Sequence, residues 1–303
     1  MRLEIIHETR YSYQPAVDTS KHVVHLRPRD GLRQKVLSFA MDVEPHPVSM
    51  GHDIDSFGNP RCFFSLSSRH DALAVIARTE VETLVTDAKA GLPETPWESV
   101  RNLLRFHKHA PWDEATEFVF PSRYALVHDD FRDYAAIDFT PGRPLVAATV
   151  ALMQRLHRDM RYVSESTDIH TPARDALRRR VGVCQDFAHI LVSCLRTFGV
   201  PARYVSGYLL TNPPPGQTRL IGADASHAWV SMYLPSADGE GANWIDLDPT
   251  NDRWAVGSPG EDYVVLAVGR DYADVSPVRG VIHGASRHLM SVAVTVKPMP
   301  ERA

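Results

Sequence analysis

Residues 182–201 read GVCQDFAHILVSCLRTFGVP, and this stretch decides the fold. Its large apolar side chains recur at helical spacing, and Gly199 followed by Pro201 is a typical helix stop. The pattern predicts a buried helix with Cys184 at its N-terminal end. There the helix dipole and the free backbone N–H groups stabilise a thiolate, which is the nucleophilic form of cysteine. We therefore expect Cys184 to be a nucleophile, with the same N–H groups available to hold an oxyanion.

The other two cysteines are expected to be structural. Cys194 falls in the apolar stripe of the same helix, and Cys62 stands beside two phenylalanines. Three cysteines without a CxxC pair form neither a disulfide framework nor the closely spaced ligands of a structural zinc site. This usage favours a reducing compartment, so the sequence predicts a cytoplasmic protein without a cofactor or metal.

The segments on either side of the helix predict an α+β core. The expected helices cover 144–157 and 171–180, and the expected strands cover 161–163, 202–210, 227–234 and 244–248. A loop with the sequence NPPPG occupies 212–216, and a turn-rich stretch fills 235–243. A further helix is expected from Pro96, because Thr95 is a good N-cap and Glu98 follows three residues later.

The first part of the chain is rich in β-branched and aromatic residues. It predicts strands at 9–13, 23–26, 35–43 and 73–84, the last with alternate residues from Leu73 to Val81 on one face. We accordingly divide the chain into an N-terminal β-rich domain (1–90), a helical connecting region (91–142), a catalytic core (143–255) and a C-terminal segment (256–303). Strands of the last segment are expected to return to the first domain.

Length and charge narrow the class of protein. The 303 residues include 44% hydrophobic and 23% charged side chains, which is typical of globular proteins. The net charge of -4 carries no basic patch for nucleic acid or an anionic membrane, and the Arg178–Arg180 run suits the last turn of a helix. Glu4 and Glu8 interrupt any signal peptide, and no apolar run could span a membrane.

A nucleophilic cysteine needs a base. His227 opens a strand with alternating faces, and Asp248 ends the strand at 244–248, just before a Pro-Thr turn. If the two strands form a hairpin centred near position 239, paired residue numbers sum to roughly 478. That register puts His227 opposite Asn251 and Asp248 opposite Val230, and a shift of a few residues would let histidine and carboxylate hydrogen-bond. Asp246, on the same face as Asp248, is the competing carboxylate.

Other residues near the predicted nucleophile have weaker assignments. The Tyr162 hydroxyl is a candidate second oxyanion donor, although an ordinary half-buried tyrosine is the preferred explanation. Gln185 and Asp186 lie in the first helical turn, where an acid suits the dipole and either side chain could touch substrate. His189 points away from Cys184 around the helix and is expected to be structural.

Five segments together resemble the bacterial transglutaminase-like family. They are GVCQDFAH at 182–189, GVPARYVSGY at 199–208, HAWV at 227–230, WIDLDPT at 244–250 and VGRDYADVSPVRG at 268–280. The strand-rich start is similar to the family's N-terminal domain, so the resemblance covers nearly the whole chain. It implies a papain-like core, with a cysteine-bearing helix packed on an antiparallel sheet. It also implies that Cys184, His227 and Asp248 are nucleophile, base and orienting residue.

These observations predict acyl transfer or hydrolysis on a peptide or glutamine-type amide through a Cys184 thioester. Water as acceptor would make the protein a peptidase or amidase, which we favour, and a lysine amine would make it a cross-linking enzyme. Two alternatives remain open: a zinc protein that uses Cys184 and His227 as ligands, and an inactive module that binds peptides in the same cleft. The sequence does not specify the substrate or the oligomeric state.

Overall fold

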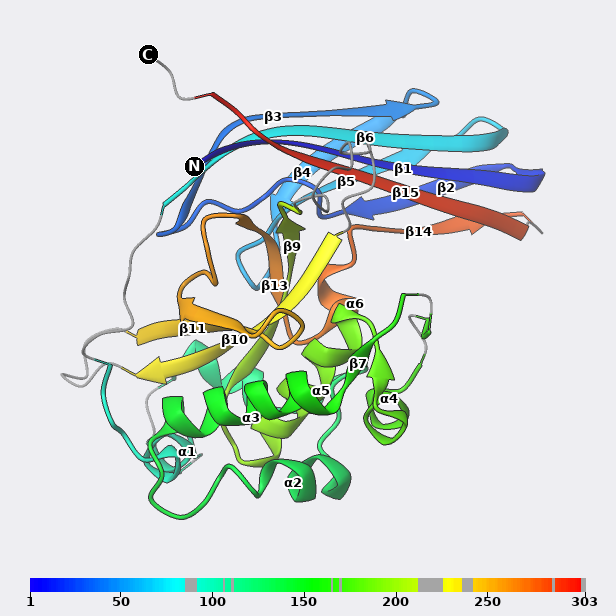
Figure 1. Ribbon diagram of the computed structural model, residues 1–303. Coiled ribbons are helices and arrows are strands. Elements are labelled where there is room, and N and C mark those ends of the chain that lie inside the picture. Colours follow the sequence, from blue (N-terminus) through cyan, green and yellow to red (C-terminus); the bar gives the residue numbers. More distant parts are fainter. Residues whose placement is uncertain are drawn as a thin grey trace, which may run out of the picture.

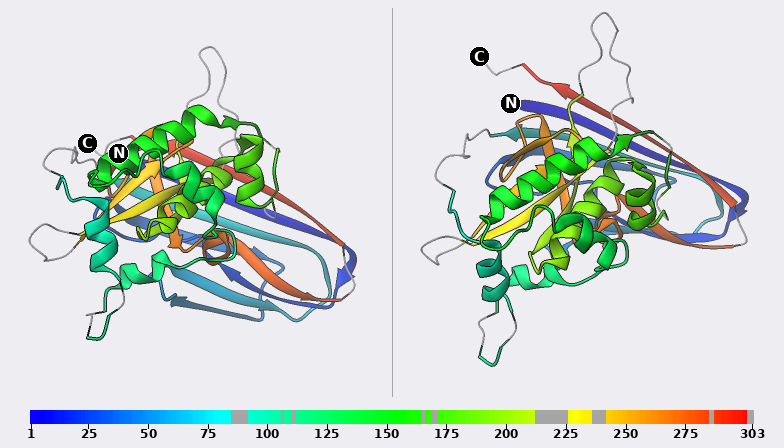
Figure 2. Two further views of the ribbon diagram at one scale, coloured as in Figure 1. Left: turned by 90° about the horizontal axis from the view of Figure 1, so that it is seen from below. Right: turned by 60° about the horizontal axis from the view of Figure 1, so that its bottom comes forward.

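A computed structural model describes residues 1–84, 92–105, 107–109, 112–164, 166–168, 171–211, 226–235, 242–284 and 287–300. Figure 1 shows a β-domain made of long strands, a second sheet beneath it, and helices below that sheet. Figure 2 shows the same layers from two further directions. The predicted loop at 212–216 and most of the turn-rich stretch at 235–243 lie outside the described residues.

The β-domain is a sandwich of two four-stranded sheets. Their orders are β15-β1-β6-β3 and β14-β2-β5-β4. Apolar side chains from both sheets, among them Val17, Phe64 and Val75, fill the space between them. The alternate residues predicted to share a face of β6, from Leu73 to Val81, are all buried. The strands are β1 (Arg2–Val17), β2 (Thr19–Val24), β3 (Gln34–Glu44), β4 (Ser49–Ile54), β5 (Pro60–Leu66), β6 (His70–Thr83), β14 (Val278–His283) and β15 (Arg287–Pro298).

The last two strands come from the far end of the chain. β15 lies antiparallel to β1 over twelve residue pairs from Leu3↔Pro298 to Gln14↔Arg287, and β14 pairs with β2. Both ends of the chain therefore build the β-domain, as Figure 1 shows by the blue and red strands lying side by side.

A five-stranded antiparallel sheet of order β12-β11-β10-β9-β13 forms the second layer. Its strands are β9 (Ala202–Leu209), β10 (Ser226–Pro235), β11 (Ala242–Asp248), β12 (Arg253–Val256) and β13 (Tyr263–Gly269). β13 lies in the stretch that the sequence analysis placed in the C-terminal segment, yet it pairs with β9 in this sheet. The structural limit of the core therefore falls after β13.

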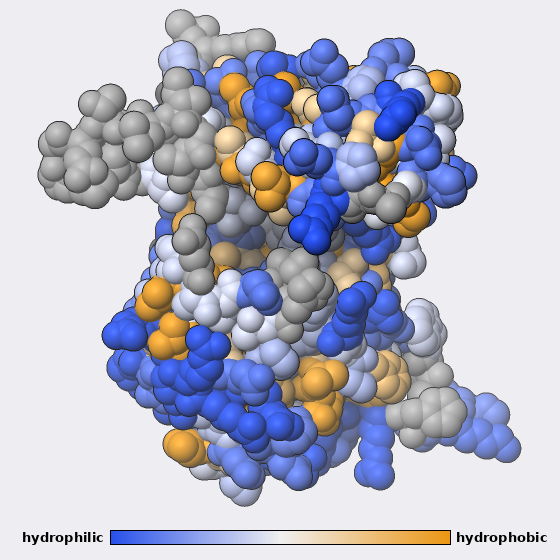
Figure 3. Space-filling view, turned by 90° about the vertical axis from the view of Figure 1, so that its right-hand side faces the viewer, coloured by the Kyte–Doolittle hydropathy of each residue, from blue (hydrophilic) through white to orange (hydrophobic). Residues whose placement is uncertain are grey.

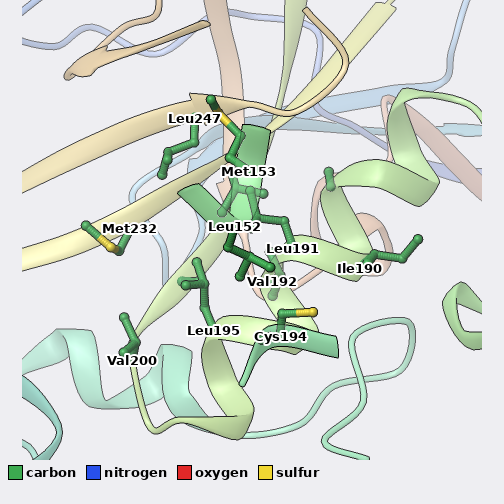
Figure 4. Close-up of a cluster of buried hydrophobic side chains, with 14 of the residues drawn as sticks. Leu152, Met153, Ile190, Leu191, Val192, Cys194, Leu195, Val200, Met232 and Leu247 are labelled. Carbon is green, nitrogen blue, oxygen red and sulfur yellow. The ribbon is translucent and has the colours of Figure 1, made fainter. Parts of the chain in front are cut away.

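Helices cover one face of this sheet. They are α1 (Trp97–Leu103), the 3-10 helix η1 (Glu114–Val119), α2 (Asp129–Ala135), α3 (Leu145–Asp159), α4 (Ala173–Arg179), α5 (Cys184–Thr197) and α6 (Tyr272–Val275), with the short strands β7 (Arg161–Tyr162) and β8 (Val181–Gly182) between them. Figure 4 shows Cys194 of α5 among apolar side chains that include Leu152 of α3, Met232 of β10 and Leu247 of β11. Cys62 is likewise buried, in the β-domain core, so both cysteines are structural as predicted.

The β-domain and the core sheet share a third apolar cluster. Leu3 and Ile5 of β1 pack with Val264 and Leu266 of β13 and with Tyr208 of β9. The same face of β1 continues into the sandwich core further along the strand, where Tyr13 and Val17 lie. Long strands of one sheet thus join both packing units.

Two side-chain amides of the β-domain bind the free edge of β13. Gln34 donates to the carbonyl of Val265 at 2.7 Å and accepts from its N–H at 2.7 Å. Asn59 makes the same two contacts with Val268, at 2.7 and 2.8 Å. Each amide acts as one residue of an additional strand and satisfies backbone groups that would otherwise be left unpaired. Figure 3 shows a waist where the β-domain, above, meets the helical part, below.

The predicted start of α1 was wrong in one detail. The helix begins after Pro96 without any side-chain cap. The Thr95 carbonyl instead accepts from the Leu145 N–H at 2.8 Å, and Pro96 forms a bridge with Pro144. Pairing with the entry to α3 therefore replaces the predicted cap. Glu98 accepts from the Gly142 N–H at 2.9 Å and joins the same two segments.

Among the described residues, no helix combines the length and apolar character that a membrane crossing requires.

Candidate active site

Cys184 is the first residue of α5, as predicted. Asp186 holds this helix start, because its carboxylate accepts from the Val183 N–H at 2.8 Å and from the Thr167 hydroxyl at 2.6 Å. A side chain at Gly182 would come within 2.8 Å of the same carboxylate, so the tight approach needs glycine. The N–H groups of Asp186 and Phe187 donate to the Val183 carbonyl, at 2.9 and 3.2 Å. The N–H groups of Cys184 and Gln185 come before them, where a helix offers no carbonyl partner.

His227 and Asp248 form a short polar contact. The distance from His227 Nε2 to Asp248 Oδ2 is 2.6 Å. His227 enters from β10, where it pairs with Gly207 of β9, and Asp248 ends β11. The structure thus brings together the three predicted residues of the candidate triad, since His227 also interacts with the thiol of Cys184.

The hairpin register differs by one residue from the sequence estimate. Val230 lies opposite Leu247 and Ser231 opposite Asp246, whereas the estimate put Asp248 opposite Val230. A shift of one residue reverses the face on which a side chain lies. In the observed register Asp248 lies level with Trp229, and Trp229 shares a face of β10 with His227. The side chains of Asp248 and His227 therefore lie on the same face of the sheet and meet.

Asp248 is fully buried and accepts hydrogen bonds on both oxygens. Oδ2 also accepts from the Tyr263 hydroxyl and from Asn251 Nδ2, each at 2.7 Å. Oδ1 accepts from the backbone N–H groups of Thr250 and Asn251, at 2.8 and 3.2 Å. Burial alone would raise the pKa of Asp248, but the bond to His227, its positive charge and the side-chain bonds from Asn251 and Tyr263 hold it below its usual value.

The histidine is correspondingly held in its charged form. Burial alone would lower the pKa of His227, but its interactions with Asp248 and Cys184 raise that pKa to about 10. The site therefore favours an imidazolium beside the Asp248 carboxylate.

The competing carboxylate, Asp246, belongs to a different group of side chains. It is buried two residues earlier on β11 and accepts from Trp229 Nε1 at 3.1 Å. Burial raises the pKa of Asp246, the opposite direction to Asp248. The preference for Asp248 as the partner of His227 is therefore supported by the geometry.

Tyr162 and Gln185 both lie beside the thiol. Tyr162 of β7 pairs with Gly182, and 49% of it is exposed. Burial and the nearby Cys184 raise the pKa of Tyr162, so its hydroxyl keeps its proton. Gln185 is half-buried in the first turn of α5, and within the described part of the chain its side chain has no hydrogen-bond partner. Both positions are compatible with contact to a substrate.

Asn251 and Tyr263 belong to the site although neither was predicted from the sequence. Asn251 follows the turn that Asp248 opens, so proximity in sequence could have suggested it. Tyr263 comes from β13, the edge strand at the far end of the sheet from β11, and no local sequence pattern predicts its contact with Asp248. His189, predicted to be structural, is buried against the rings of Tyr124 and Tyr204 and accepts from the Tyr272 N–H at 3.2 Å.

Within the described ranges, no three His, Cys, Asp or Glu side chains are grouped in a way that could hold a metal ion. The zinc alternative required Cys184, His227 and a carboxylate as ligands. The carboxylate next to His227 is Asp248, and it contacts Nε2 of His227 at 2.6 Å.

Comparison with known proteins agrees with this architecture. Residues 3–82 match the bacterial transglutaminase-like N-terminal region, and residues 136–249 match the transglutaminase-like superfamily core. An uncharacterised protein of Mycobacterium tuberculosis is 38% identical over 303 residues, which cover 98% of this chain and 93% of the relative. This chain belongs to the transglutaminase-like superfamily.

Two further relatives of this transglutaminase-like protein are more distant. A protein-glutamine gamma-glutamyltransferase of Pseudomonas aeruginosa is 35% identical over 72 residues, 23% of this chain and 10% of that protein. A crystal structure from Cytophaga hutchinsonii, assigned provisionally as a cysteine protease, superposes with a TM-score of 0.73 at 21% identity. The superposition covers 100% of this chain and 92% of the other, so the two share the α+β fold with an N-terminal β-domain.

Proposed function

We propose that the protein is a cysteine-dependent amidase or peptidase that forms an acyl thioester on Cys184. The observation that carries the proposal is the position of His227, bonded to Asp248 on one side and interacting with Cys184 on the other. A nucleophile, a base and a residue that orients the base are the three parts that such chemistry requires.

In the proposed first step the Cys184 thiolate attacks the carbonyl carbon of an amide. The first-turn N–H groups of α5 stabilise the oxyanion that develops. Nε2 of His227 is engaged by Asp248, which leaves Nδ1 to give its proton to the departing amine as the C–N bond breaks. Cys184 then carries the acyl group as a thioester.

In the second step His227 takes a proton from water, and the resulting hydroxide attacks the thioester carbonyl. The C–S bond breaks, a carboxylic acid leaves, and the thiolate and imidazolium are restored. Asp248 keeps the imidazole in one orientation throughout and remains a carboxylate, because five hydrogen bonds reach its oxygens.

Either water or an amine can accept the acyl group from Cys184. The protease assignment of the Cytophaga protein favours water, and the name of the Pseudomonas relative favours an amine. The same residues serve both reactions. We propose water as the main acceptor, because the Cytophaga structure superposes over the whole chain and the Pseudomonas protein matches only 23% of it. Incubation with a glutamine-containing peptide pool and a fluorescent primary amine separates them: hydrolysis yields carboxylates, and transfer yields a fluorescent conjugate.

The thioester itself can be tested without knowing the natural substrate. Rapid acid quench during incubation with cell-extract peptides, followed by mass spectrometry, should find an acyl adduct on the tryptic peptide that contains Cys184. Replacement of Cys184 by alanine should abolish it, and Cys62→Ala should not, because burial raises the pKa of the Cys62 thiol to about 11. An unmodified Cys184 that also resists iodoacetamide near neutral pH would contradict the proposal and favour an inactive binding module.

A further inference from the structure

A cavity of about 940 Å³ lies between the β-domain and the catalytic core, away from the thiol. Arg29, Phe57 and Arg61 line it from the β-domain, and Trp112, Glu114 and Arg203 line it from the core. A smaller cavity of about 300 Å³ adjoins it, and Arg29 and Arg203 line both. These two guanidinium groups therefore stand where the cavities meet.

Neither guanidinium has an anion in contact with it. Arg29 donates only to neutral acceptors, the Phe57 carbonyl and Asn59 Oδ1, both at 3.3 Å. Arg203 lies 3.8 Å from the ring centroid of Trp244, and its buried Nε has no partner. Within the described part of the chain, no carboxylate reaches either group at salt-bridge distance. Both arginines are half-buried, and charges that are partly withdrawn from water are normally paired, because their desolvation is costly.

The two arginines also lie close enough for their positive charges to repel each other. Burial lowers the pKa of Arg203 to about 10, and the neighbouring charge of Arg29 acts in the same direction. The nearest buried carboxylate, Asp246, is separated from Arg203 by a strand, because both pair with Ser231. Asp246 interacts electrostatically with both arginines, so one negative charge faces two positive charges.

Several other charges of the cavity are already paired within the protein. Arg61 binds Asp53, and Arg270 binds Asp274 at 2.9 Å. Asp55 accepts from the N–H groups of Phe57 and Asn59. Arg279 is exposed and donates to the Ala273 carbonyl at 3.0 Å. Arg29 and Arg203 are the half-buried cations of the lining without a carboxylate partner among the described residues, and they face one exposed carboxylate, that of Glu114.

We propose that this cavity is a second ligand site, in which Arg29 and Arg203 together bind the carboxylate of a peptide-like monoanion. A fork of guanidinium N–H groups matches the geometry of a carboxylate. The acidic residues of the lining disfavour an ion with several negative charges. Phe57, Phe118 and Trp112 offer an apolar surface beside the arginines, and 78% of Trp112 is exposed. The ligand therefore carries an apolar or aromatic group next to its carboxylate.

The site is distinct from the thiol site. Arg203 pairs with Ser231, four residues along β10 from His227, a separation on the order of 13 Å. Because one arginine belongs to the β-domain and the other to the core, a bound carboxylate would bridge the two units without covering Cys184.

Isothermal titration calorimetry of the full chain with N-acetyl-L-phenylalanine tests the proposal. We expect saturable binding at one site, and binding at least about tenfold weaker for the neutral N-acetyl-L-phenylalaninamide. Arg29→Gln and Arg203→Gln should each weaken carboxylate binding by about tenfold or more. Arg78→Gln is the matched control, because Arg78 pairs with Asp42 on the exposed face of the β-domain.

Three results would overturn the proposal. One is equal affinity for the acid and the amide in the wild-type protein, which needs no variant to fold. Another is unchanged affinity for the acid in both arginine variants with native circular dichroism. The third is tighter binding of inorganic phosphate than of the carboxylate. None of these depends on thiol chemistry, so the outcome is separate from that of the thioester test.

Discussion

Asp248 is the residue on which the charge state of the site depends. Its five hydrogen bonds arrive from β10, β13 and the turn after β11, so its position is determined by three parts of the core. Because those donors stabilise the carboxylate, the negative charge remains next to His227 and keeps the imidazole protonated. In the proposed reaction, the protonated imidazole would in turn stabilise a thiolate at Cys184.

Replacement of Asp248 by asparagine should therefore slow alkylation of Cys184. The substitution removes the charge and hydrogen bond that contribute most to raising the pKa of His227. Without that carboxylate the pKa of His227 should fall towards its ordinary 6.5, so at pH 7.5 most of the imidazole should be neutral and the rate with iodoacetamide about tenfold lower. Asp246→Asn is the control, since Asp246 is equally buried but bonds to Trp229. Equal slowing in both variants would show that buried charge in general, and not this pair, activates the thiol.

The same pair should make stability depend on pH. The pKa of His227 rises from 6.5 to about 10 on folding, so folding favours the protonated form. The stabilisation is complete below about pH 6.5 and is lost as the pH rises towards 10. Urea unfolding should measure the free energy of unfolding of the wild-type protein and of His227→Gln at both pH values. The advantage of the wild type should be larger at pH 6 than at pH 10, by on the order of 1–3 kcal/mol. A pH-independent difference would mean that the histidine is neutral in the folded protein.

At this scale, the sequence identified residues whose chemistry depends on local position. A cysteine at a helix start and a histidine at a strand start have properties that can be reasoned from neighbours in the chain. Tyr263 could not be found in this way, because its role arises only when β13 pairs with β9 and brings its hydroxyl to Asp248.

Among the elements, β10 depends on close packing at Gly207. This residue of β9 pairs with His227, and a Cβ there would lie 2.2 Å from the Val264 carbonyl and 2.4 Å from the Trp229 ring. No side chain fits between a backbone oxygen and a buried indole without displacing one of them. The absence of a side chain at Gly207 therefore sets the spacing of β10 and β13 around the His227–Asp248 pair.

Gly207→Ala should both destabilise the protein and disturb the site. We expect a loss of about 2–3 kcal/mol in the free energy of unfolding, typical of overpacking in a dense core. Because the Trp229 ring must move, the alkylation rate of Cys184 should fall as well. Gly31→Ala is the matched control, since nothing lies within 4 Å of a Cβ at that position. A fully stable Gly207→Ala protein with a normal rate would contradict this account.

Element types were more predictable than their junctions. The helical period of 187–198 and the alternation of β6 were read correctly, because each follows from residues within one element. The start of α1 and the β10–β11 register depend on a second segment, and both were misjudged: Pro96 pairs with Pro144, and the hairpin is shifted by one residue. Loop length estimates a register only approximately, yet one residue decides the face.

On the scale of the whole molecule, the β-domain and the core are joined more closely than a linker would join them. A shared apolar cluster links β1 with β9 and β13. Gln34 and Asn59 bind the backbone of β13 directly. His7 of β1 adds a buried contact of 3.0 Å to the Tyr208 hydroxyl. The sequence suggested that the C-terminal strands return to the first domain, but contacts between residues about two hundred positions apart have no local signature.

Because of these contacts, we expect the β-domain and the core to unfold together. The buried cysteines can report on each of the two units separately. Cys62 lies in the sandwich core and Cys194 in the helical core. Burial raises the pKa of both thiols, so neither should react in the folded protein. In a urea series with brief iodoacetamide pulses, both cysteines should become reactive over the same range of urea concentration.

Leu266→Ala, which removes part of the shared cluster from the core side, should shift both transitions to lower urea by an amount equivalent to about 2–4 kcal/mol. Labelling of Cys62 well before Cys194 would instead show that the β-domain unfolds on its own, and that the contacts to β13 are too weak to couple it to the catalytic core.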